Sequence, residues 1–421
     1  MSEIRICGGR PLCGEIKIQG SKNAVLPMMA ASLLHEGVTV IENVPRIQDV
    51  SCMMGILEYM GCKCRMEGNT LSICAKGNIT SEVPKRYVKQ MRSSIIILGA
   101  LLGRNKKAAT CYPGGCSIGK RPIDLHLKAL EKLGAVIFED GNRIEAIAEG
   151  GGRGLYGGEI IFPFPSVGAT ENALLGAVKA RGTTFIRGAS AEPEITAFCR
   201  FLIGMGACIE GIGSRNLTVC GVDSLKDSVF KAPGDRIVAG TYLMSAMASG
   251  GEVKTSGINP GELSAVEEIL KLAGGKIQKE ENSISVKTDG RVKAVSVSTE
   301  PYPGFPTDLQ SPFMALMTVA QGESRIEENI FEGRYETAGE LRKMGADITV
   351  SGKTAVVKGK NGLTGNVVEA TDLRGGAALA AAGLAAKGVT VIRSCRHIER
   401  GYEDICRDLK SAGADIMRTD D

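Results

Sequence analysis

The sequence has no tryptophan, and aromatic residues make up only 4% of it. Because large aromatic side chains often supply much of a core's buried area, this core must be built from aliphatic and small residues. No apolar run reaches the roughly 18 residues that a membrane span requires. The first residues, MSEIRICGG, also lack an apolar signal region. We therefore expect a cytoplasmic protein without membrane insertion.

Motifs for several kinds of chemistry are missing as well. There is no GxxxxGK[ST] loop, which disfavours nucleoside-triphosphate chemistry. Only three histidines occur, without a carboxylate cluster or paired CxxC motifs, so we expect neither a metal nor another cofactor. The net charge of +4, from 51 basic and 47 acidic residues, is too balanced to indicate a nucleic-acid partner. A small anionic substrate needs only a few local Lys and Arg.

Cysteine is present in an odd number, 13, in a long chain. This usage favours reduced thiols over a disulfide framework. Cysteine also behaves as a small apolar residue. We therefore expect most of these thiols to pack in the core.

A helical pattern that ends in glycine recurs six times, at intervals of 68–73 residues. A glycine just past a helix end commonly adopts positive φ. A strand-like run precedes each of these helices, as in VTVIENV and VTVIRSC. The six glycines are Gly61, Gly134, Gly206, Gly274, Gly345 and Gly413.

A second helical pattern, made almost entirely of small and apolar residues, precedes each strand-like run. Examples are Asn23–Leu34, Ser93–Leu102, Ala169–Ala180 and Gly375–Ala386. A helix that is apolar all round is normally buried. Each unit is therefore predicted as buried helix, strand, outer helix and strand, in an α/β fold with helices inside and sheets around them.

Six such units suggest two lobes of three. We expect a continuous lobe at residues 21–229 and a discontinuous lobe made of 1–20 and 230–421. Lys226–Gly234 is a plausible crossover between them. The leading segment, Ile4–Gln19, belongs to no complete unit and could complete the last unit from the other end of the chain.

Arginines recur at matching points of the repeat. Arg121 and Arg400 each stand 13 residues before the shared glycine, and Arg334 stands 11 before it. An arginine at a helix N-terminus opposes the helix dipole, so an anion between them would explain it. A surface arginine paired with Asp124 or Glu403 is the plainer alternative.

Charged residues also stand at the starts of the apolar helices. Burying an unpaired charge is costly, so these groups should face one another or a ligand. Helix capping would account for the two aspartates but not for the cations. The residues are Lys22, Arg92, Asp308, Asp372 and Arg374.

The stretch Tyr112–His126, YPGGCSIGKRPIDLH, places Cys116 on a glycine-rich loop ahead of Lys120 and Arg121. Pro122 suits the first position of a helix. A thiol beside cations has a lowered pKa and can act as an acid or a nucleophile. The loop would then be a lid over a phosphorylated substrate, with the cations as an anion clamp and a carboxylate as general base. Alternatively, it is a flexible surface loop with an incidental cysteine.

Seven motifs, in order, resemble one enzyme family from end to end: GSKNA, PGGCSIGKRPIDLH, PSVGAT, PGDRI, YPGFPTDLQ, TDLRGG and HIERGYE. The chain resembles the UDP-N-acetylglucosamine 1-carboxyvinyltransferases, which are enolpyruvyl transferases. Cys116 in the GGC loop favours them over the sister 5-enolpyruvylshikimate-3-phosphate synthases.

The resemblance implies a two-lobed inside-out α/β barrel with six βαβαββ repeats, three in each lobe. It implies transfer of enolpyruvyl from phosphoenolpyruvate to the 3-hydroxyl of UDP-N-acetylglucosamine, through a tetrahedral ketal and with release of phosphate. This is the first committed step of peptidoglycan synthesis. A catalytically silent nucleotide-sugar-binding paralogue and a transferase acting on shikimate-3-phosphate are the alternatives.

The resemblance also assigns roles residue by residue. Cys116 matches the proton donor, which can also hold a covalent phosphoenolpyruvate adduct. Asp308 matches the group that takes the hydroxyl proton, and Asp372 matches a second carboxylate near the reacting carbon. The phosphoenolpyruvate clamp is expected at Lys22, Arg121 and Arg400, with Arg92 and Arg374 nearby.

Contacts to the nucleotide sugar are implied along the whole chain. Two departures from the family pattern, Phe164 where many members have lysine and the EGRYE stretch around Arg334, leave the finer nucleotide contacts open. The expected contacts, with Arg334 counted among the substrate-binding residues, are Asn23, Arg121, Pro122, Ile123, Asp124, Leu125, Ser166, Val167, Gly168, Asp308 and Ile330.

Overall fold

The computed structural model describes residues 2–114, 122–149, 154–289 and 291–419, which divide into two compact units. The first unit comprises the described residues between 20 and 233. The second comprises residues 2–19 and the described residues between 234 and 419. Each unit contains one hydrophobic core cluster. Within the described parts of the chain, no helix is both long and apolar enough to span a membrane.

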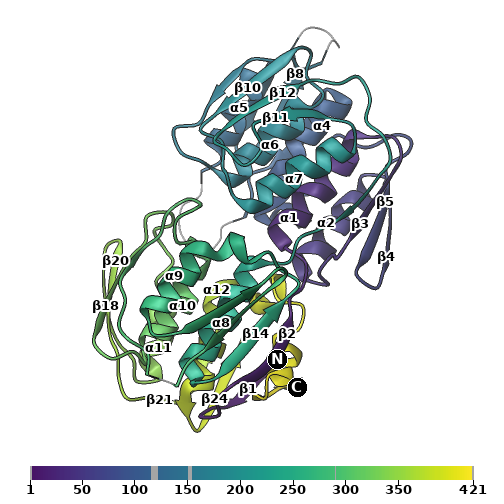
Figure 1. The fold of residues 1–421 in the computed structure, drawn as a ribbon. Helices are drawn as coiled ribbons and strands as arrows, with labels where there is room; N and C mark the ends of the chain where they lie inside the picture. Colours follow the sequence, from purple (N-terminus) through teal and green to yellow (C-terminus); the bar gives the residue numbers. More distant parts are fainter. Residues whose placement is uncertain (1, 115–121, 150–153, 290, 420–421) are drawn as a thin grey trace. The chain divides into compact units, whose positions relative to one another are not determined.

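Three sheets form the outside of the first unit (Figure 1). Their strand orders are β13–β3–β5–β4, β6–β8–β7 and β11–β12–β10–β9. The strands are β3 (Val38–Glu42), β4 (Lys63–Glu67), β5 (Thr70–Cys74), β6 (Lys107–Cys111), β7 (Ala135–Asp140), β8 (Arg143–Ala148), β9 (Glu159–Ile161), β10 (Thr183–Arg187), β11 (Cys208–Glu210), β12 (Asn216–Cys220) and β13 (Ser228–Lys231).

Buried helices occupy the interior of the first unit. Helix α4 packs against both α1 and α6, and small or aliphatic residues cover all sides of these helices. The inner elements are α1 (Lys22–Ala31), η1 (Ser32–Leu34), η2 (Arg92–Ile96), α4 (Ile97–Asn105) and α6 (Val167–Ala177). The outer helices are α2 (Gln48–Tyr59), α3 (Lys85–Val88), α5 (Asp124–Lys132) and α7 (Pro193–Gly204).

The second unit has the same plan, with three four-stranded sheets and the short pair β21–β23. The strand orders are β15–β16–β14–β2, β17–β18–β20–β19 and β22–β24–β1–β25. The strands are β1 (Glu3–Cys7), β2 (Cys13–Lys17), β14 (Glu252–Ser256), β15 (Lys276–Glu280), β16 (Ser283–Lys287), β17 (Val297–Ser298), β18 (Glu323–Glu327), β19 (Asp347–Ser351), β20 (Thr354–Lys358), β21 (Leu363–Thr364), β22 (Val367–Glu369), β23 (Ala386–Lys387), β24 (Val389–Arg393) and β25 (Asp415–Thr419).

Three inner helices of the second unit, α8, α10 and α12, all pack against one another. They are α8 (Arg236–Ser249), η4 (Thr307–Leu309) continuing into α10 (Gln310–Met317), and α12 (Leu373–Ala385). The outer elements are η3 (Pro260–Leu263), α9 (Ser264–Leu272), α11 (Glu336–Lys343), η5 (Cys395–Arg400) and α13 (Ile405–Ser411).

The repeat is a βαβαββ unit. In one copy, β9 pairs in parallel with β10 across the inner helix α6. The outer helix α7 then leads to the antiparallel strands β11 and β12. All six repeat glycines lie two residues after the end of an outer helix and have positive φ, as predicted. The fold is an inside-out α/β barrel, with helices at the centre of each unit and sheets and outer helices around them.

Two repeats take their first strand from a distant part of the chain. Strand β13 pairs in parallel with β3 in the first unit, and β2 pairs in parallel with β14 in the second. Strand β1 lies between β24 and β25, so both chain ends meet in one sheet (Figure 1). The leading segment therefore completes the last repeat, as expected, and also supplies a strand to another.

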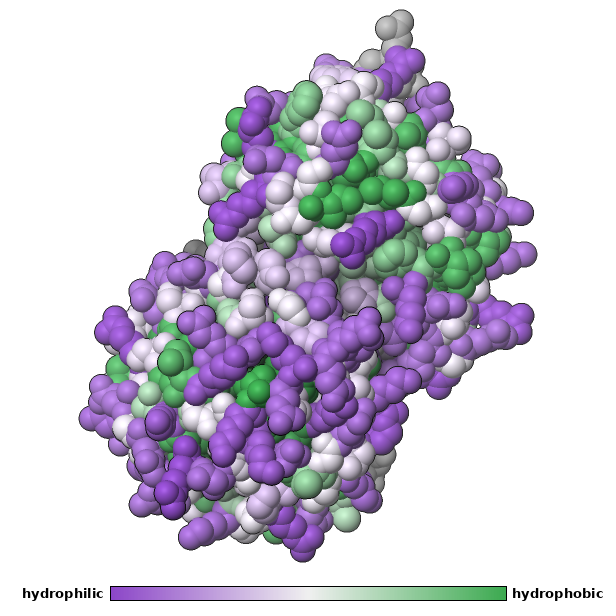
Figure 2. Space-filling model, viewed as in Figure 1, coloured by the Kyte–Doolittle hydropathy of each residue, from purple (hydrophilic) through white to green (hydrophobic). Residues whose placement is uncertain are grey.

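The cysteines follow the prediction only in part. Only Cys62, Cys199 and Cys395 are buried among the described cysteines, all of which are free. The prediction that most pack in the core holds in part, since Cys52, Cys64, Cys111 and Cys406 are partly buried and pack against the cores. Others lie on strands whose side chains alternate between core and solvent, as Cys208 and Cys220 do in β11 and β12. Most of the large exposed apolar side chains likewise lie on strands, and Figure 2 shows hydrophobic patches bordered by hydrophilic residues.

Candidate active site

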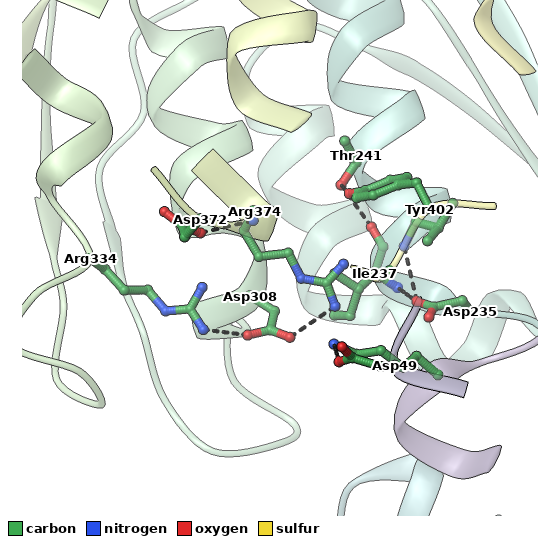
Figure 3. A network of polar contacts seen from close by, with 12 residues as sticks. Asp49, Asp235, Ile237, Thr241, Asp308, Arg334, Asp372, Arg374 and Tyr402 are labelled. Atoms are coloured by element: carbon green, nitrogen blue, oxygen red, sulfur yellow. Dashed lines mark hydrogen bonds and ion pairs between the residues drawn. The ribbon is translucent and has the colours of Figure 1, made fainter. Parts of the chain in front are cut away.

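Asp308 is held between two buried arginines of the second unit (Figure 3). Its Oδ1 accepts a hydrogen bond from Nη2 of Arg334 at 2.5 Å, and its Oδ2 accepts one from Nη2 of Arg374 at 3.0 Å. Both arginine side chains are 4% exposed, whereas that of Asp308 is 24% exposed. The carboxylate thus reaches solvent, while the two cations that fix it are buried.

Three elements bring these side chains together. Asp308 lies in η4, Arg334 precedes α11 and Arg374 is the second residue of α12. Helix capping, the alternative explanation for Asp308, does not apply. Pro306 is the N-cap of η4, and the carboxylate oxygens of Asp308 accept from the arginines instead.

The other predicted cap, Asp372, is confirmed. Its Oδ1 accepts from the backbone N–H groups of Arg374 at 2.9 Å and Gly375 at 3.0 Å, which satisfies two donors at the start of α12. A Cβ on Gly375 would lie 2.2 Å from Oγ1 of Thr337, so only glycine fits there. The cap therefore fixes the backbone from which the Arg374 side chain reaches Asp308.

The charge of Arg374 is balanced inside the protein. Burial works against its charged form, but the carboxylate of Asp308, together with Tyr402 and Asp235, outweighs this and raises the pKa of Arg374 above its ordinary value. Among the described residues, Nη1 of Arg374 and Nε of Arg334 are buried donors without a hydrogen-bond acceptor. Such donors would be stabilised by an anion.

Tyr402 forms a buried support for Arg374 (Figure 3). The guanidinium carbon of Arg374 lies 5.9 Å from the centroid of the Tyr402 ring, which suits a cation–π contact. The hydroxyl of Tyr402 shares a 2.8 Å hydrogen bond with Oγ1 of Thr241 in α8. The ring thereby connects the arginine to an inner helix.

Arg400 lies at the end of η5 and is half-buried. The outer helix α13 starts only at Ile405, and Asp404 caps it, so the expected place of Arg400 directly before this helix is wrong. Gln19 holds the turn after Arg400 from both sides. Its Nε2 donates to the carbonyl of Gly401 at 2.9 Å, and its Oε1 accepts from the N–H of Glu403 at 2.7 Å.

Lys22, in the first unit, begins α1 and pairs with Asp49 in the first turn of α2. Its Nζ lies 3.2 Å from Oδ2 of Asp49, and the two side chains are 12% and 6% exposed. Asn23 follows in α1, and Arg92 begins η2; both are half-buried. The Lys22 amine is thus held in place by a nearly buried carboxylate.

Two more groups of predicted contacts lie at the starts of α5 and α6, which pack together. Ser166 caps α6, where its Oγ accepts from the N–H of Ala169 at 3.4 Å. A Cβ on Gly168 would lie 2.9 Å from Cε1 of His126, so glycine permits the close packing of α6 on α5. The structure therefore brings together Pro122, Ile123, Asp124 and Leu125 with Ser166, Val167 and Gly168.

Pro122 is not the first residue of its helix. Ile123 is the N-cap, since its carbonyl accepts the first helical hydrogen bonds, and α5 begins at Asp124. Ile330 lies in the loop after β18, where its N–H donates to Glu328. Phe164, one of the two departures from the family pattern, is 41% exposed.

Sequence comparison places the chain in a known family. The EPSP synthase (3-phosphoshikimate 1-carboxyvinyltransferase) family model matches residues 6–409. A UDP-N-acetylglucosamine 1-carboxyvinyltransferase 2 from Caldanaerobacter subterraneus subsp. tengcongensis is 45% identical over 419 residues, covering 99% of this chain and 100% of its own. A UDP-N-acetylglucosamine 1-carboxyvinyltransferase from Myxococcus xanthus is 44% identical, covering 99% of both chains.

The chain belongs to the UDP-N-acetylglucosamine 1-carboxyvinyltransferase family. It is therefore an enzyme of the enolpyruvyl transferase class. Solved structures agree in fold. The enolpyruvyl transferase NikO from Streptomyces tendae has a TM-score of 0.88 at 24% identity, with 99% of each chain covered. An EPSP synthase from Acinetobacter baumannii has a TM-score of 0.74 at 18% identity, with 100% of each chain covered.

Two central predictions for this carboxyvinyltransferase-family chain, Cys116 and Arg121, lie outside the described residues. Their roles therefore stay predictions. Across the parts of the chain that are described, no group of three or more His, Cys, Asp or Glu side chains could hold a metal ion.

Several residues that hold the predicted side chains in place were not predicted from the sequence. The sequence around Asp49 and Gln19 does not indicate their roles. Asp49 pairs with Lys22, 27 residues away, and Gln19 contacts Gly401 and Glu403 near the other end of the chain. Tyr402 stood within the HIERGYE motif, so its place in that motif was a usable signal. Glu328 had no signal beyond its charge.

Proposed function

We propose that this chain transfers the enolpyruvyl group of phosphoenolpyruvate to the 3-hydroxyl of UDP-N-acetylglucosamine and releases phosphate. The proposal rests on one observation above all. In a chain of this family, the solvent-reaching carboxylate of Asp308 is fixed by the buried guanidinium groups of Arg334 and Arg374. A fixed carboxylate beside cations can accept a proton from a sugar hydroxyl next to a bound anion.

The reaction would run by addition and then elimination. Asp308 takes the proton of the sugar 3-hydroxyl as that oxygen bonds to C2 of phosphoenolpyruvate. Cys116 donates a proton to C3, which gives a tetrahedral ketal. Loss of a proton from C3 and of phosphate from C2 then restores the double bond. The same thiol could instead bond to C2 and hold phosphoenolpyruvate as an adduct.

The cations would hold the negatively charged substrate. Lys22, Arg121 and Arg400 would clamp phosphoenolpyruvate, with Arg92 and Arg374 close by. Two properties of the described residues support this assignment. Lys22 is fixed by Asp49, and Arg374 has a buried donor, Nη1, without a protein acceptor.

The nucleotide sugar would bind at the starts of α1, α5 and α6 and at the loop that carries Ile330. Helix N-termini suit the diphosphate because their free N–H groups and dipole attract anions. Phe164 cannot supply a cation, so this chain would hold the diphosphate without one at that position. We further propose a cytoplasmic location and a role in peptidoglycan synthesis, and hence in cell growth and division, as the resemblance implies.

A phosphate-release assay tests the proposal. Release should require both phosphoenolpyruvate and UDP-N-acetylglucosamine, and no release with the pair would refute it. Shikimate-3-phosphate in place of the nucleotide sugar tests the acceptor named by the matching family model. Cys116→Ala should abolish turnover, and activity equal to wild type would remove the thiol as proton donor. A silent paralogue would bind the nucleotide sugar without turnover.

A further inference from the structure

Glu328 is a buried carboxylate that accepts hydrogen bonds from four neutral donors. It follows β18 and is 1% exposed. The hydroxyl of Thr299 donates to Oε1 at 2.9 Å, and that of Thr307 lies 3.0 Å from Oε1 and 2.9 Å from Oε2. The backbone N–H groups of Ile330 and Phe331 donate to Oε1 at 2.8 and 3.1 Å.

These donors come from segments that also form the candidate active site. Thr307 directly precedes Asp308 in η4. The ring of Phe331 lies 5.1 Å from the guanidinium carbon of Arg334, which in turn pairs with Asp308. The contacts form a closed circuit from Glu328 through Thr307, Asp308, Arg334 and Phe331 back to Glu328.

We propose that Glu328 is a positioning residue for the reaction, acting through Asp308 and Arg334. It fixes the η4 turn and the loop after β18 against each other. The distance between the η4 turn and this loop determines where the Asp308 carboxylate lies relative to the sugar hydroxyl. It also determines the position of Ile330. This inference rests on the role proposed for Asp308 above.

The circuit requires a side chain with one acceptor oxygen for the backbone N–H groups and a second polar atom for Thr307. Oε1 alone accepts from both backbone N–H groups, which are partly buried and whose desolvation this oxygen offsets. Oε2 is left for Thr307, the only one of the four donors adjacent to Asp308. An error of about 1 Å in the placement of a reacting group can cost about 100-fold in rate.

The test is steady-state phosphate release by the full-length enzyme with both substrates. Glu328→Ala should lower kcat about 100-fold and leave the KM for phosphoenolpyruvate within about twofold. Glu328→Gln should retain activity within about fivefold of wild type, since its carbonyl oxygen keeps the two N–H bonds and its amide can donate to Thr307. Glu327→Gln, on the neighbouring position of β18, is the matched control and should behave as wild type.

Thr307→Val removes one hydroxyl and keeps the side-chain shape, so it tests the circuit even if Glu328→Ala does not fold. Thr307→Val should lower kcat about tenfold at an assay temperature below its Tm. Thr299→Val, which loses the bond from Thr299 to Oε1 of Glu328, should lower kcat less. Wild-type kcat in both Glu328→Ala and Thr307→Val, or equal loss in Glu328→Gln and Glu328→Ala, would overturn the proposal. Absence of phosphate release by the wild type would instead overturn the proposed function.

Discussion

At the scale of single residues, the charge of Asp308 should affect both the stability of the fold and the rate of catalysis. Asp308→Asn keeps the shape but leaves Arg334 and Arg374 without a carboxylate, so we expect a loss of about 2 kcal/mol in the free energy of unfolding. This is below the cost of breaking a fully buried pair, because Asp308 is 24% exposed. With the proposed general base removed, kcat should fall at least about 100-fold.

Thermal unfolding and phosphate release measure the two effects separately. Asp347→Asn, at an exposed position of β19, is the control and should change neither quantity. A variant at Asp308 with wild-type kcat would show that another group takes the hydroxyl proton.

Glu171 gives a prediction for pH. It lies buried in α6, and burial together with the neighbouring Glu194 raises its pKa from 4.5 to about 8. Between these values the unfolded chain has lost the proton and the folded chain retains it. The folded state therefore loses stability as the pH rises from 4.5 to about 8, by an amount on the order of 5 kcal/mol.

Glu171→Gln should remove this dependence. The Tm of wild type should fall relative to that of the variant as the pH rises from about 5 to about 8. Glu210→Gln, at an exposed position of β11, is the control and should follow wild type. A constant difference between wild type and Glu171→Gln across this range would contradict the buried, protonated carboxyl.

Local chemistry decided which residue roles could be predicted. Asp372 precedes a helix and caps it, so its structure follows from its immediate neighbours. Asp308 stands in a similar sequence context but pairs with arginines 26 and 66 residues away. Such partners come together only when the inner and outer helices pack. The partners of Glu328 also come from separate segments, so no sequence pattern predicted its role.

At the scale of elements, two glycines, one inside α11 and one just past its end, should respond in opposite ways to substitution by alanine. Gly345, just past the helix, has a φ of +93°, and no atom would lie within 4 Å of an added Cβ. Gly345→Ala should therefore lower stability by about 1 kcal/mol through backbone strain alone. Gly339, inside the same helix, also has open space for a Cβ and no positive φ. Gly339→Ala should raise stability by about 0.5–1 kcal/mol.

Chemical denaturation of both variants measures the difference. Opposite signs are expected, and destabilisation by both substitutions would contradict the assigned helix end. The repeat made this position predictable, because a glycine recurs at the same point, after one outer helix of each repeat. The exchange of β2 and β13 was not predictable from local pattern, since it depends on pairing between distant strands.

At the scale of the whole molecule, the two units have separate hydrophobic cores. That each folds as an independent lobe stays a prediction. Phe313→Ala would open a cavity in the second core, where the ring is fully buried and lies 5.4 Å from that of Phe305. The cost should be about 3–5 kcal/mol.

Hydrogen exchange can locate this loss. Peptides from residues 2–19 and 234–419 should exchange faster in Phe313→Ala, while those from 20–233 should change little. The matched variant Phe198→Ala, in the first core, should show the reverse. Equal acceleration in both units by either variant would indicate one cooperative structure.

At this same scale, we propose that the whole enzyme joins an enolpyruvyl group to a nucleotide sugar. Mass spectrometry of the products, after incubation with phosphoenolpyruvate and UDP-N-acetylglucosamine, tests it most directly. We expect a nucleotide sugar that has gained one enolpyruvyl group, in an amount equal to the phosphate released. An unchanged nucleotide sugar, or transfer to shikimate-3-phosphate instead, would contradict it.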